Sequence, residues 1–472
     1  MDFSGGHRSS HLWEMARQAK NRYLLAAIAF TILSFSVYLC WAVILPFDAA
    51  PDEGMRYQIP QFIYHYGTLP HGGDPLIRNA AWGISYGFTP ILSYMIGALF
   101  MRITGIFTTD AAALLLSARL VSVLCNTGTV IICFLIAGRL FKGLYRWLFV
   151  CFVAFLPQFM FIGAYVNNDS LAIFSTAMIV YAWIRNLSSR WAWPDCVLLA
   201  VGVSLCALSY YNAYGFILCS ILLYLGDRYQ AYRALHCAAN SLPAREFWRE
   251  TGRRAGLMVG IVLLLAGWWF IRNAIIYQGD ILGMRTSDYY GELYGVGGCK
   301  PSLSNSAYHM HWSLWRLLIT EHWLQNSYKS FIGCFGYMNI WLDKRIYLFF
   351  TILWSLAITG LLSLALSHKD RRPFISVSRQ GLFTGIMLLA LPIPFALSLY
   401  YTFFCNLQPQ GRYLLPMVIP MMVFITRGAQ QLIDRLFPKR WIQTTIQLAI
   451  CSVAFAVVVY CYIGILLPKY VY

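Results

Sequence analysis

Long apolar runs separated by short polar connections dominate the sequence. A run of about 20 apolar residues can cross about 30 Å of hydrocarbon as a helix. The pattern predicts eleven such helices within a single integral membrane domain, residues 1–472. The predicted spans are Tyr23–Leu45, Ala111–Leu140, Trp147–Tyr165, Leu171–Ile184, Cys196–Leu208, Tyr211–Leu225, Ala255–Ile276, Ile346–Leu366, Leu382–Phe404, Leu414–Ile425 and Trp441–Leu467. The expected fold class is all-α, a polytopic helical membrane protein.

Basic residues set the orientation of these spans. The first apolar run is too long for a signal peptide and follows a basic segment, His7–Arg22, so it reads as a retained span with a cytoplasmic N-terminus. In the eleven-span topology, clusters holding 23 of the 36 Lys and Arg residues fall on the cytoplasmic side, as the positive-inside rule requires. The C-terminus is then extracytoplasmic.

One further apolar stretch, Phe88–Ile106, would invert every later loop if it crossed the membrane. It follows Pro90 and carries Arg102, so we interpret it as a juxtamembrane or re-entrant helix on the outer side. Two long outer loops result, at about 46–110 and about 277–345. They are rich in Trp, Tyr and Gly, which predicts ordered loops, and long ordered loops are usually functional.

Composition excludes the other broad classes. Charged residues are 12% of the chain and hydrophobic residues 59%, with a mean hydropathy of +0.58. Soluble domains carry about 25% charged residues, and disordered chains are poor in apolar residues. The net charge of +17 therefore reflects membrane topology, and no nucleic-acid partner is expected.

Two adjacent carboxylates, Asp52 and Glu53, lie shortly after the first span. Carboxylates at a membrane interface lose hydration, so we expect raised pKa values that would suit them as catalytic proton acceptors. Pro51-Asp52-Glu53 is equally a good helix start, and the alternative role is an N-cap.

Two more polar elements lie at the same outer face. Asn167-Asn168-Asp169 stands between two spans and could equally form a tight turn with an N-cap. Gln410-Gly411-Arg412-Tyr413 precedes another span. An Arg at an outer helix start opposes both the charge rule and the helix dipole, so Arg412 needs an anionic partner unless it snorkels.

Arginines supply the complementary charge. Arg119 lies in the first outer turns of an apolar span, where a buried cation calls for a partner. Arg56 is also near the outer face, and guanidinium groups suit phosphate or pyrophosphate. Because these residues come from distant loops yet share one face, we predict a common site there.

Motifs for ATP-driven or metal-dependent chemistry are missing from the sequence. It has no P-loop, no G-x-G-x-x-G after a strand, no H-E-x-x-H and no G-x-S-x-G. His309 and His311 could meet on an extended segment, but no metal or other cofactor is expected. An enzyme at the outer face would need an activated substrate already in the membrane.

Several short motifs resemble one family. They are Pro51-Asp52-Glu53, Leu156-Pro157-Gln158 with Asn167-Asn168-Asp169, Arg272-Asn273 with Tyr277-Gln278-Gly279-Asp280, Ser330-Phe331-Ile332-Gly333-Cys334-Phe335-Gly336, and Gln410-Gly411-Arg412-Tyr413. The chain resembles a group of bacterial polytopic membrane proteins of formerly unknown function, which are similar to the GT-C superfamily of glycosyltransferases. Relatives include protein O-mannosyltransferases and aminoarabinose transferases.

The resemblance implies transfer of a sugar from a polyprenyl-phosphate donor to a glycan, lipid or protein acceptor on the extracytoplasmic side, with inversion at the anomeric carbon. Asp52 and Glu53 match the family's acidic base, although Gly54 follows where the family commonly has Pro and then His. Arg119 resembles the Arg that contacts the donor phosphate. The remaining expected substrate-binding residues are Arg56, Asn167, Asn168, Asp169, Gln410, Arg412 and Tyr413.

Other readings stay open on the sequence. A transporter or flippase of lipid-linked saccharides would place ionisable residues along a path through the membrane. A polysaccharide polymerase or ligase would keep the chemistry and use a pyrophosphate-linked glycan. The outer-loop residues Trp82, Trp312, Trp315 and Trp323 could stack on sugars or belong to an aromatic belt.

Overall fold

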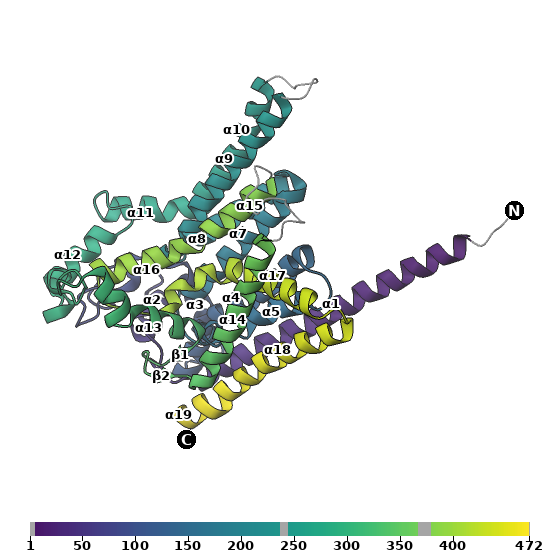
Figure 1. The fold of residues 1–472 in the computed structure, drawn as a ribbon. Helices are drawn as coiled ribbons and strands as arrows, with labels where there is room; N and C mark the ends of the chain where they lie inside the picture. The colour runs from purple at the N-terminus through teal and green to yellow at the C-terminus, as the bar shows by residue number, and fades with distance from the viewer. Residues whose placement is uncertain (1–4, 237–243, 367–378, 472) are drawn as a thin grey trace.

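The computed structural model describes residues 5–236, 244–366 and 379–471, whose regular structure is almost entirely helical (Figure 1). The α-helices are α1 (Gly5–Ile44), α2 (Glu53–Tyr66), α3 (Leu92–Gly105), α4 (Ala111–Leu140), α5 (Tyr145–Ala154), α6 (Pro157–Ile162), α7 (Asp169–Ser189), α8 (Trp193–Ala207), α9 (Gly215–His236), α10 (Ala244–Val262), α11 (Trp268–Ile276), α12 (Met284–Tyr294), α13 (Trp323–Ile332), α14 (Lys344–Leu366), α15 (Arg379–Leu389), α16 (Pro392–Phe404), α17 (Val418–Leu436), α18 (Arg440–Tyr460) and α19 (Leu467–Tyr470). Short 3-10 or π segments are η1 (Tyr86–Phe88), η2 (Tyr211–Ala213), η3 (Leu263–Gly267), η4 (Gly297–Cys299), η5 (Pro301–Leu303), η6 (Arg316–Thr320), η8 (Gly411–Met417) and η9 (Cys461–Leu466). Strands β1 (Cys334–Phe335) and β2 (Ile340–Trp341) pair antiparallel.

Within these ranges, eight helical segments are long and apolar enough to cross a membrane. They are Asn21–Ile44, Ala111–Leu140, Asp169–Ser189, Ala244–Ile276, Lys344–Leu366, Arg379–Phe404, Gly411–Leu436 and Arg440–Tyr470. Each coincides with a predicted span, which confirms the all-α polytopic fold; the count of eleven stays a prediction. At Phe88–Ile106 the structure has α3, whose 14 residues are fewer than the about 20 of a straight span.

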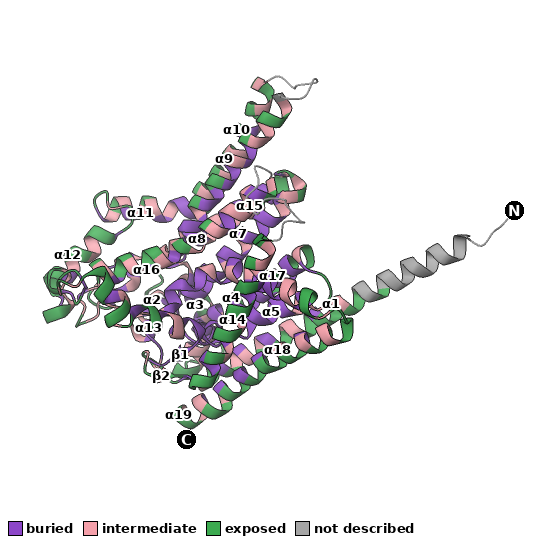
Figure 2. Ribbon diagram, viewed as in Figure 1, coloured by how far each residue is buried: buried purple, intermediate pink, exposed green. Residues whose placement is uncertain are grey.

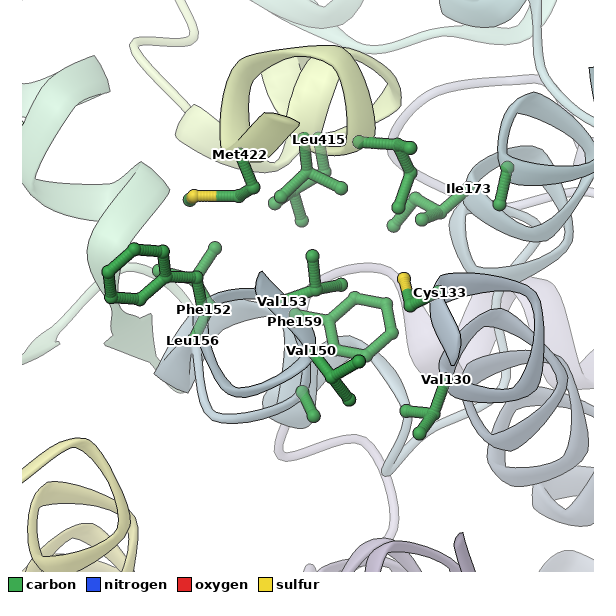
Figure 3. Packing of buried hydrophobic residues seen from close by; sticks show 14 of the residues in the cluster. Val130, Cys133, Val150, Phe152, Val153, Leu156, Phe159, Ile173, Leu415 and Met422 are labelled. Carbon is green, nitrogen blue, oxygen red and sulfur yellow. The ribbon is translucent and has the colours of Figure 1, made fainter. Parts of the chain in front are cut away.

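The predicted span Trp147–Tyr165 is not one helix. It is divided into α5 and α6 because Pro157, in the first turn of α6, cannot continue the hydrogen-bond ladder of α5. The Asn126 side chain of α4 donates to the carbonyl of Phe159 in α6 at 2.6 Å, which ties α6 to α4. Such a break is tolerated at membrane depth only inside protein. Figure 3 shows it packed in the core, among Val130, Cys133, Val150, Phe152, Val153, Leu156, Phe159, Ile173, Leu415 and Met422.

Buried residues are concentrated in α4, α5, α6 and α7, whereas the surrounding helices carry many exposed positions (Figure 2). These exposed positions include many large apolar residues. Helices α9 and α10 project together at the top of the view, and α1 extends away to the right (Figure 1). Helices α14 and α17 pack closely through small residues. A Cβ on Gly428 would lie 1.9 Å from the carbonyl oxygen of Ala357, so this crossing requires glycine.

The two long loops predicted on the outer side are ordered and contact each other. Arg272 of α11 donates to the carbonyl of Pro70 at 2.8 Å, and the backbone N–H of Gly72 donates to the Tyr277 hydroxyl at 3.0 Å. Asp280 then accepts from the backbone of Thr286 at 2.8 Å in the first turn of α12. The Arg-Asn and Tyr-Gln-Gly-Asp motifs therefore join the two loops.

Candidate functional site

Asp52 forms an ion pair with Arg412 across 360 residues of sequence. It precedes α2 in a left-handed conformation (φ 64°, ψ 10°), and its side chain makes no capping hydrogen bond to that helix. Instead, Arg412 Nη2 donates to Asp52 Oδ2 at 2.7 Å. The N-cap and snorkelling alternatives are therefore not what the structure shows for these residues.

A second pair lies against the first. Arg56 of α2 donates through Nη1 to Oδ2 of Asp169, in the first turn of α7, at 3.0 Å. Its Nη2 lies 3.8 Å from Asp52 Oδ2, too far for a hydrogen bond. Arg56, Asp169 and Arg412 are buried, whereas the Asp52 side chain is 33% exposed. We call these four side chains the charge cluster.

The two arginines of the charge cluster, and residues next to the cluster in sequence or in space, carry polar atoms that no protein group satisfies. Arg56 Nε and Nη2, Arg412 Nε, Gln410 Oε1, Asn168 Oδ1 and the Tyr94 hydroxyl are buried without hydrogen-bond partners. An unpaired buried polar atom costs about 1–3 kcal/mol, more when it belongs to a charged group. Three of them belong to the two buried cations and need an explanation, and a polar ligand supplies one.

The arginines also control the protonation of Asp52. Burial opposes its ionisation, but the positive charges of Arg412 and Arg56 outweigh burial and lower the pKa of the carboxyl from its ordinary value. The expectation of a raised pKa is therefore wrong for Asp52. With Arg412 and Arg56 in place, this carboxylate is ionised at neutral pH and ready to accept a hydrogen bond.

Asp52 also faces a cleft of about 490 Å³, which we call the Asp52 cleft. The first turns of α2 form one wall, with Tyr57, Gln58 and Gln61. Trp82 and Tyr337 stand on other walls. Of the charge cluster, only Asp52 lines this cleft, so its carboxylate separates the cleft from the buried arginines.

Glu53 and Arg119 are brought together, but as a closed pair. Arg119 Nε and Nη2 donate to the two Glu53 oxygens at 2.8 and 2.7 Å. The remaining Arg119 N–H groups donate to the carbonyls of Ala42, Leu45 and Pro46 at the end of α1. All five N–H groups are thus used, and Arg119 has none left for a donor phosphate, contrary to the role that the resemblance implied.

Glu53 is fully buried and faces the protein. It also accepts from the backbone N–H groups of Val166 at 3.0 Å and Asp48 at 3.2 Å. In this structure Glu53 ties the chain after α1 to the chain before α7. The pair therefore holds the segments that carry Asp52 and Asp169, and Glu53 does not share the Asp52 cleft.

The Asn167-Asn168-Asp169 motif divides its roles. Asn167 Oδ1 accepts from the backbone of Ser170 at 2.9 Å, and its amide donates to carbonyls of the preceding turn. Its geometry is that of the turn and helix cap considered as the alternative. Asn168 donates to the carbonyl of Ser209 at 3.2 Å, and Asp169 belongs to the charge cluster.

The Gln-Gly-Arg-Tyr motif is held by the Ser-Phe-x-Gly-x-Phe-Gly motif. The backbone N–H of Gly411 donates to Ser330 Oγ at 2.7 Å. Tyr413 donates to Gln408 and accepts from Arg412 at 3.3 Å, so this turn aims the Arg412 guanidinium at Asp52. The feature of the sequence that indicated an anionic partner for Arg412 was its unfavourable position at an outer helix start.

Gly411→Ala is expected to destabilise the protein by about 1–3 kcal/mol, the usual cost of overpacking. The added Cβ would lie 2.0 Å from the backbone nitrogen of Phe331, so the turn that carries Arg412 must move. Thermal unfolding in detergent checks this. Gly385→Ala is the matched control, because its Cβ would meet nothing within 4 Å. Equal unfolding temperatures for the two variants would contradict the argument.

Sequence reasoning missed the residues that surround the cluster. The Tyr86 ring packs 4.7 Å beneath the Arg56 guanidinium, and Gln58 and Asn79 line the cleft. None of these residues has a sequence signal, because each lies in an irregular or amphipathic segment. Of the four outer-loop Trp residues, Trp82 lines the cleft, whereas Trp323 is fully buried and donates to Thr402 Oγ1 at 3.1 Å.

The histidine pair has other contacts. His309 Nδ1 lies 3.1 Å from Ser304 Oγ and 3.0 Å from the Ser304 carbonyl oxygen. Across the described ranges, no group of three or more His, Cys, Asp or Glu side chains is arranged to hold a metal ion.

Comparison with known proteins places the fold. A family model described as "Predicted membrane protein (DUF2142)" matches residues 78–422. No curated protein matches the chain. Among solved structures, ArnT from Cupriavidus metallidurans in the apo state is similar, with a TM-score of 0.50 and 14% identity over 92% of this chain. The matched region is 63% of the ArnT chain, so this protein corresponds to only part of ArnT.

Two further structures carry lipid phosphates. ArnT from the same organism bound to undecaprenyl phosphate has a TM-score of 0.50 and 14% identity, over 91% of this chain and 63% of that one. The archaeal oligosaccharyltransferase AglB from Archaeoglobus fulgidus, in complex with an inhibitory peptide and a dolichol-phosphate, has a TM-score of 0.52 and 12% identity, over 92% and 54%. The chain thus has a GT-C-like membrane fold.

Proposed function

The chain belongs to the DUF2142 family of predicted membrane proteins, and we propose that it is a membrane glycosyltransferase with a polyprenyl-phosphate-linked sugar donor. The observation that carries this proposal is the charge cluster, where two buried guanidinium groups keep unpaired N–H donors behind a carboxylate that faces the Asp52 cleft. Arginine donors suit a phosphate, and an ionised carboxylate suits an acceptor hydroxyl. The fold supports it, since structures with this fold hold undecaprenyl phosphate and dolichol-phosphate.

The reaction is a single displacement. The acceptor oxygen forms a bond to the anomeric carbon while the bond from that carbon to the phosphate oxygen breaks, which inverts the anomeric configuration. Asp52 takes the hydroxyl proton, and Arg412 and Arg56 stabilise the charge on the departing polyprenyl phosphate. The acceptor is a cell-envelope glycan, lipid or protein.

Donor binding and base activation are coupled through Arg412. The four cluster charges already balance, so a phosphate that binds Arg412 competes with Asp52 for it. Once Arg412 turns to the phosphate, Asp52 loses its strongest partner, and burial then raises its pKa towards a value useful in proton transfer. The base is therefore strengthened only when the donor is present.

A binding measurement tests the donor assignment. Native mass spectrometry of the purified full-length protein should show undecaprenyl phosphate bound and undecaprenol, which lacks the phosphate, unbound. Arg412→Ala should weaken binding about tenfold or more, which corresponds to about 1.4 kcal/mol, whereas Arg285→Ala at an exposed position should not. Equal retention of both lipids by the wild type would overturn the proposal.

The reaction products and the donor required distinguish a transferase from the alternative functions, a transporter or flippase and a polymerase or ligase. A transferase releases free undecaprenyl phosphate and a glycosylated acceptor in detergent solution. A transporter or flippase moves the intact lipid-linked saccharide across the membrane and forms neither product. A polymerase or ligase requires undecaprenyl pyrophosphate-linked glycan in place of the monophosphate donor.

The pH dependence should differ between free enzyme and complex. A base must be deprotonated, so the rate falls as pH drops through its pKa. Because Arg412 and Arg56 lower that pKa, the acid limb of kcat/KM for the donor should lie below the ordinary aspartate pKa. The acid limb of kcat should lie at higher pH than that of kcat/KM. In the donor complex Arg412 binds the phosphate and no longer lowers the pKa of Asp52. Coincident limbs would contradict the coupling.

We place the site on the extracytoplasmic face of a bacterial inner membrane, with the N-terminus cytoplasmic and the C-terminus outside. A membrane-impermeant maleimide on intact cells should modify Cys299, which is partly exposed in the second long loop. Peptide mapping by mass spectrometry locates the adduct, and Cys299→Ser is the control. Modification of Cys299 only after permeabilisation would overturn this orientation.

A further inference from the structure

The lining of the Asp52 cleft has a distinctive chemistry. Its side chains include four aromatic residues, three carboxamides and two carboxylates, and no Lys, Arg or His. Its volume of about 490 Å³ lies within the ~300–1,000 Å³ of small-molecule sites. The cleft therefore has the size and polarity of a binding site, and its charge is opposite to that of the arginines behind Asp52.

The charge excludes one class of ligand. Asp48 and Asp52 both line the cleft and no cationic side chain does, so a phosphate or a sugar acid there would meet two carboxylates, with the Arg412 guanidinium behind Asp52 and already paired with it. The donor phosphate must therefore reach the arginines by another side of Asp52. The two reactants of a transfer would then approach Asp52 from different sides.

The remaining lining suits hydroxyl-bearing rings. Trp82 is half-buried at the cleft and offers a flat apolar face of the kind that packs against the C–H face of a sugar ring. Gln58 and Gln61 each carry a donor and an acceptor on the α2 wall; Gln61 is exposed, and Gln58 Oε1 is buried without a hydrogen-bond partner. Paired donors and acceptors without net charge match sugar hydroxyls.

We propose that the Asp52 cleft is the acceptor site and that it takes an uncharged saccharide, with one hydroxyl directed at Asp52. This inference rests on the proposed function and names the substrate class that the function leaves open. It chooses a neutral glycan over a phosphorylated or acidic glycan and over a peptide acceptor.

Saturation-transfer difference NMR tests this on the purified full-length protein. The probes are a pool of neutral methyl glycosides, a pool of the matching uronic acids and a serine-containing peptide. We expect signals from the neutral pool alone. Trp82→Ala and Gln61→Ala should each reduce those signals about five- to tenfold, the loss expected from one stacking or hydrogen-bonding partner. Trp441→Ala, at an exposed position on α18, should leave them unchanged.

Signals from the uronic acids or the peptide at the strength of the neutral pool would overturn the inference. So would neutral signals that Trp82→Ala and Gln61→Ala leave intact. Undecaprenyl phosphate binding, measured on the same samples, keeps the two proposals apart. If the lipid binds and the neutral glycosides do not, the acceptor inference fails alone, and if the lipid does not bind, the donor assignment fails.

Discussion

Asp52→Asn is expected to reduce sugar transfer per folded molecule by about 10²-fold or more, the usual contribution of a general base. The substitution removes the proton acceptor but keeps an oxygen that can accept from Arg412 Nη2. Binding of undecaprenyl phosphate should stay intact or become tighter, because Arg412 no longer has an anionic partner in the protein. Loss of turnover with undiminished donor binding is thus the signature of Asp52 as the base.

The measurement is single-turnover transfer from a radiolabelled undecaprenyl-phosphate sugar, beside lipid affinity by native mass spectrometry. Asp110→Asn is the matched control. Asp110 caps α4 by accepting from Ala113 at 2.9 Å, and asparagine caps a helix equally well. Near-wild-type turnover in purified Asp52→Asn would remove the catalytic assignment.

The spans were predictable because a backbone in lipid must satisfy its own hydrogen bonds, which favours a continuous helix. Ala111–Leu140 has the same bounds in the sequence pattern and in α4, since an apolar run of 30 residues in a bilayer satisfies its backbone only as a helix. Trp147–Tyr165 is equally apolar, and hydropathy alone does not show its break. Pro157 was the local signal for it, and burial on every side is what makes the break tolerable.

The location of the site was predictable, but the pairing within it was not. Counting charges placed Asp52, Asp169 and Arg412 at one face, and the structure joins them in one cluster. Asp52 precedes α2 in a left-handed conformation and Glu53 is the first residue of the helix, so the two side chains leave the chain in different directions. Asp52 therefore faces Arg412 and the cleft, while Glu53 turns into the protein towards Arg119. Which carboxylate meets which arginine depends on packing that sequence spacing does not encode.

Arg119→Ala is expected to lower the free energy of unfolding by about 3–5 kcal/mol, the cost of leaving one partner of a buried ion pair alone. It leaves Glu53 fully buried without its cation, and it removes the donors that satisfy three carbonyls at the end of α1. Glu53→Gln should lower the free energy of unfolding by less than Arg119→Ala does, because the glutamine side chain keeps one oxygen that accepts from Arg119. Arg316→Ala breaks a largely exposed Arg–Glu pair joined by a single contact of 3.0 Å and should cost only about 0–1 kcal/mol.

Denaturant unfolding in detergent measures these losses, and undecaprenyl phosphate affinity of the folded fraction identifies their cause. If the Arg119–Glu53 pair supports the chain around Asp52, Arg119→Ala protein that stays folded should bind the lipid with near-wild-type affinity, because Arg119 has no N–H group to spare. The phosphate-ligand role implied by the resemblance requires the reverse, wild-type stability with weakened lipid binding. That result would mean that Arg119 releases Glu53 when the donor enters.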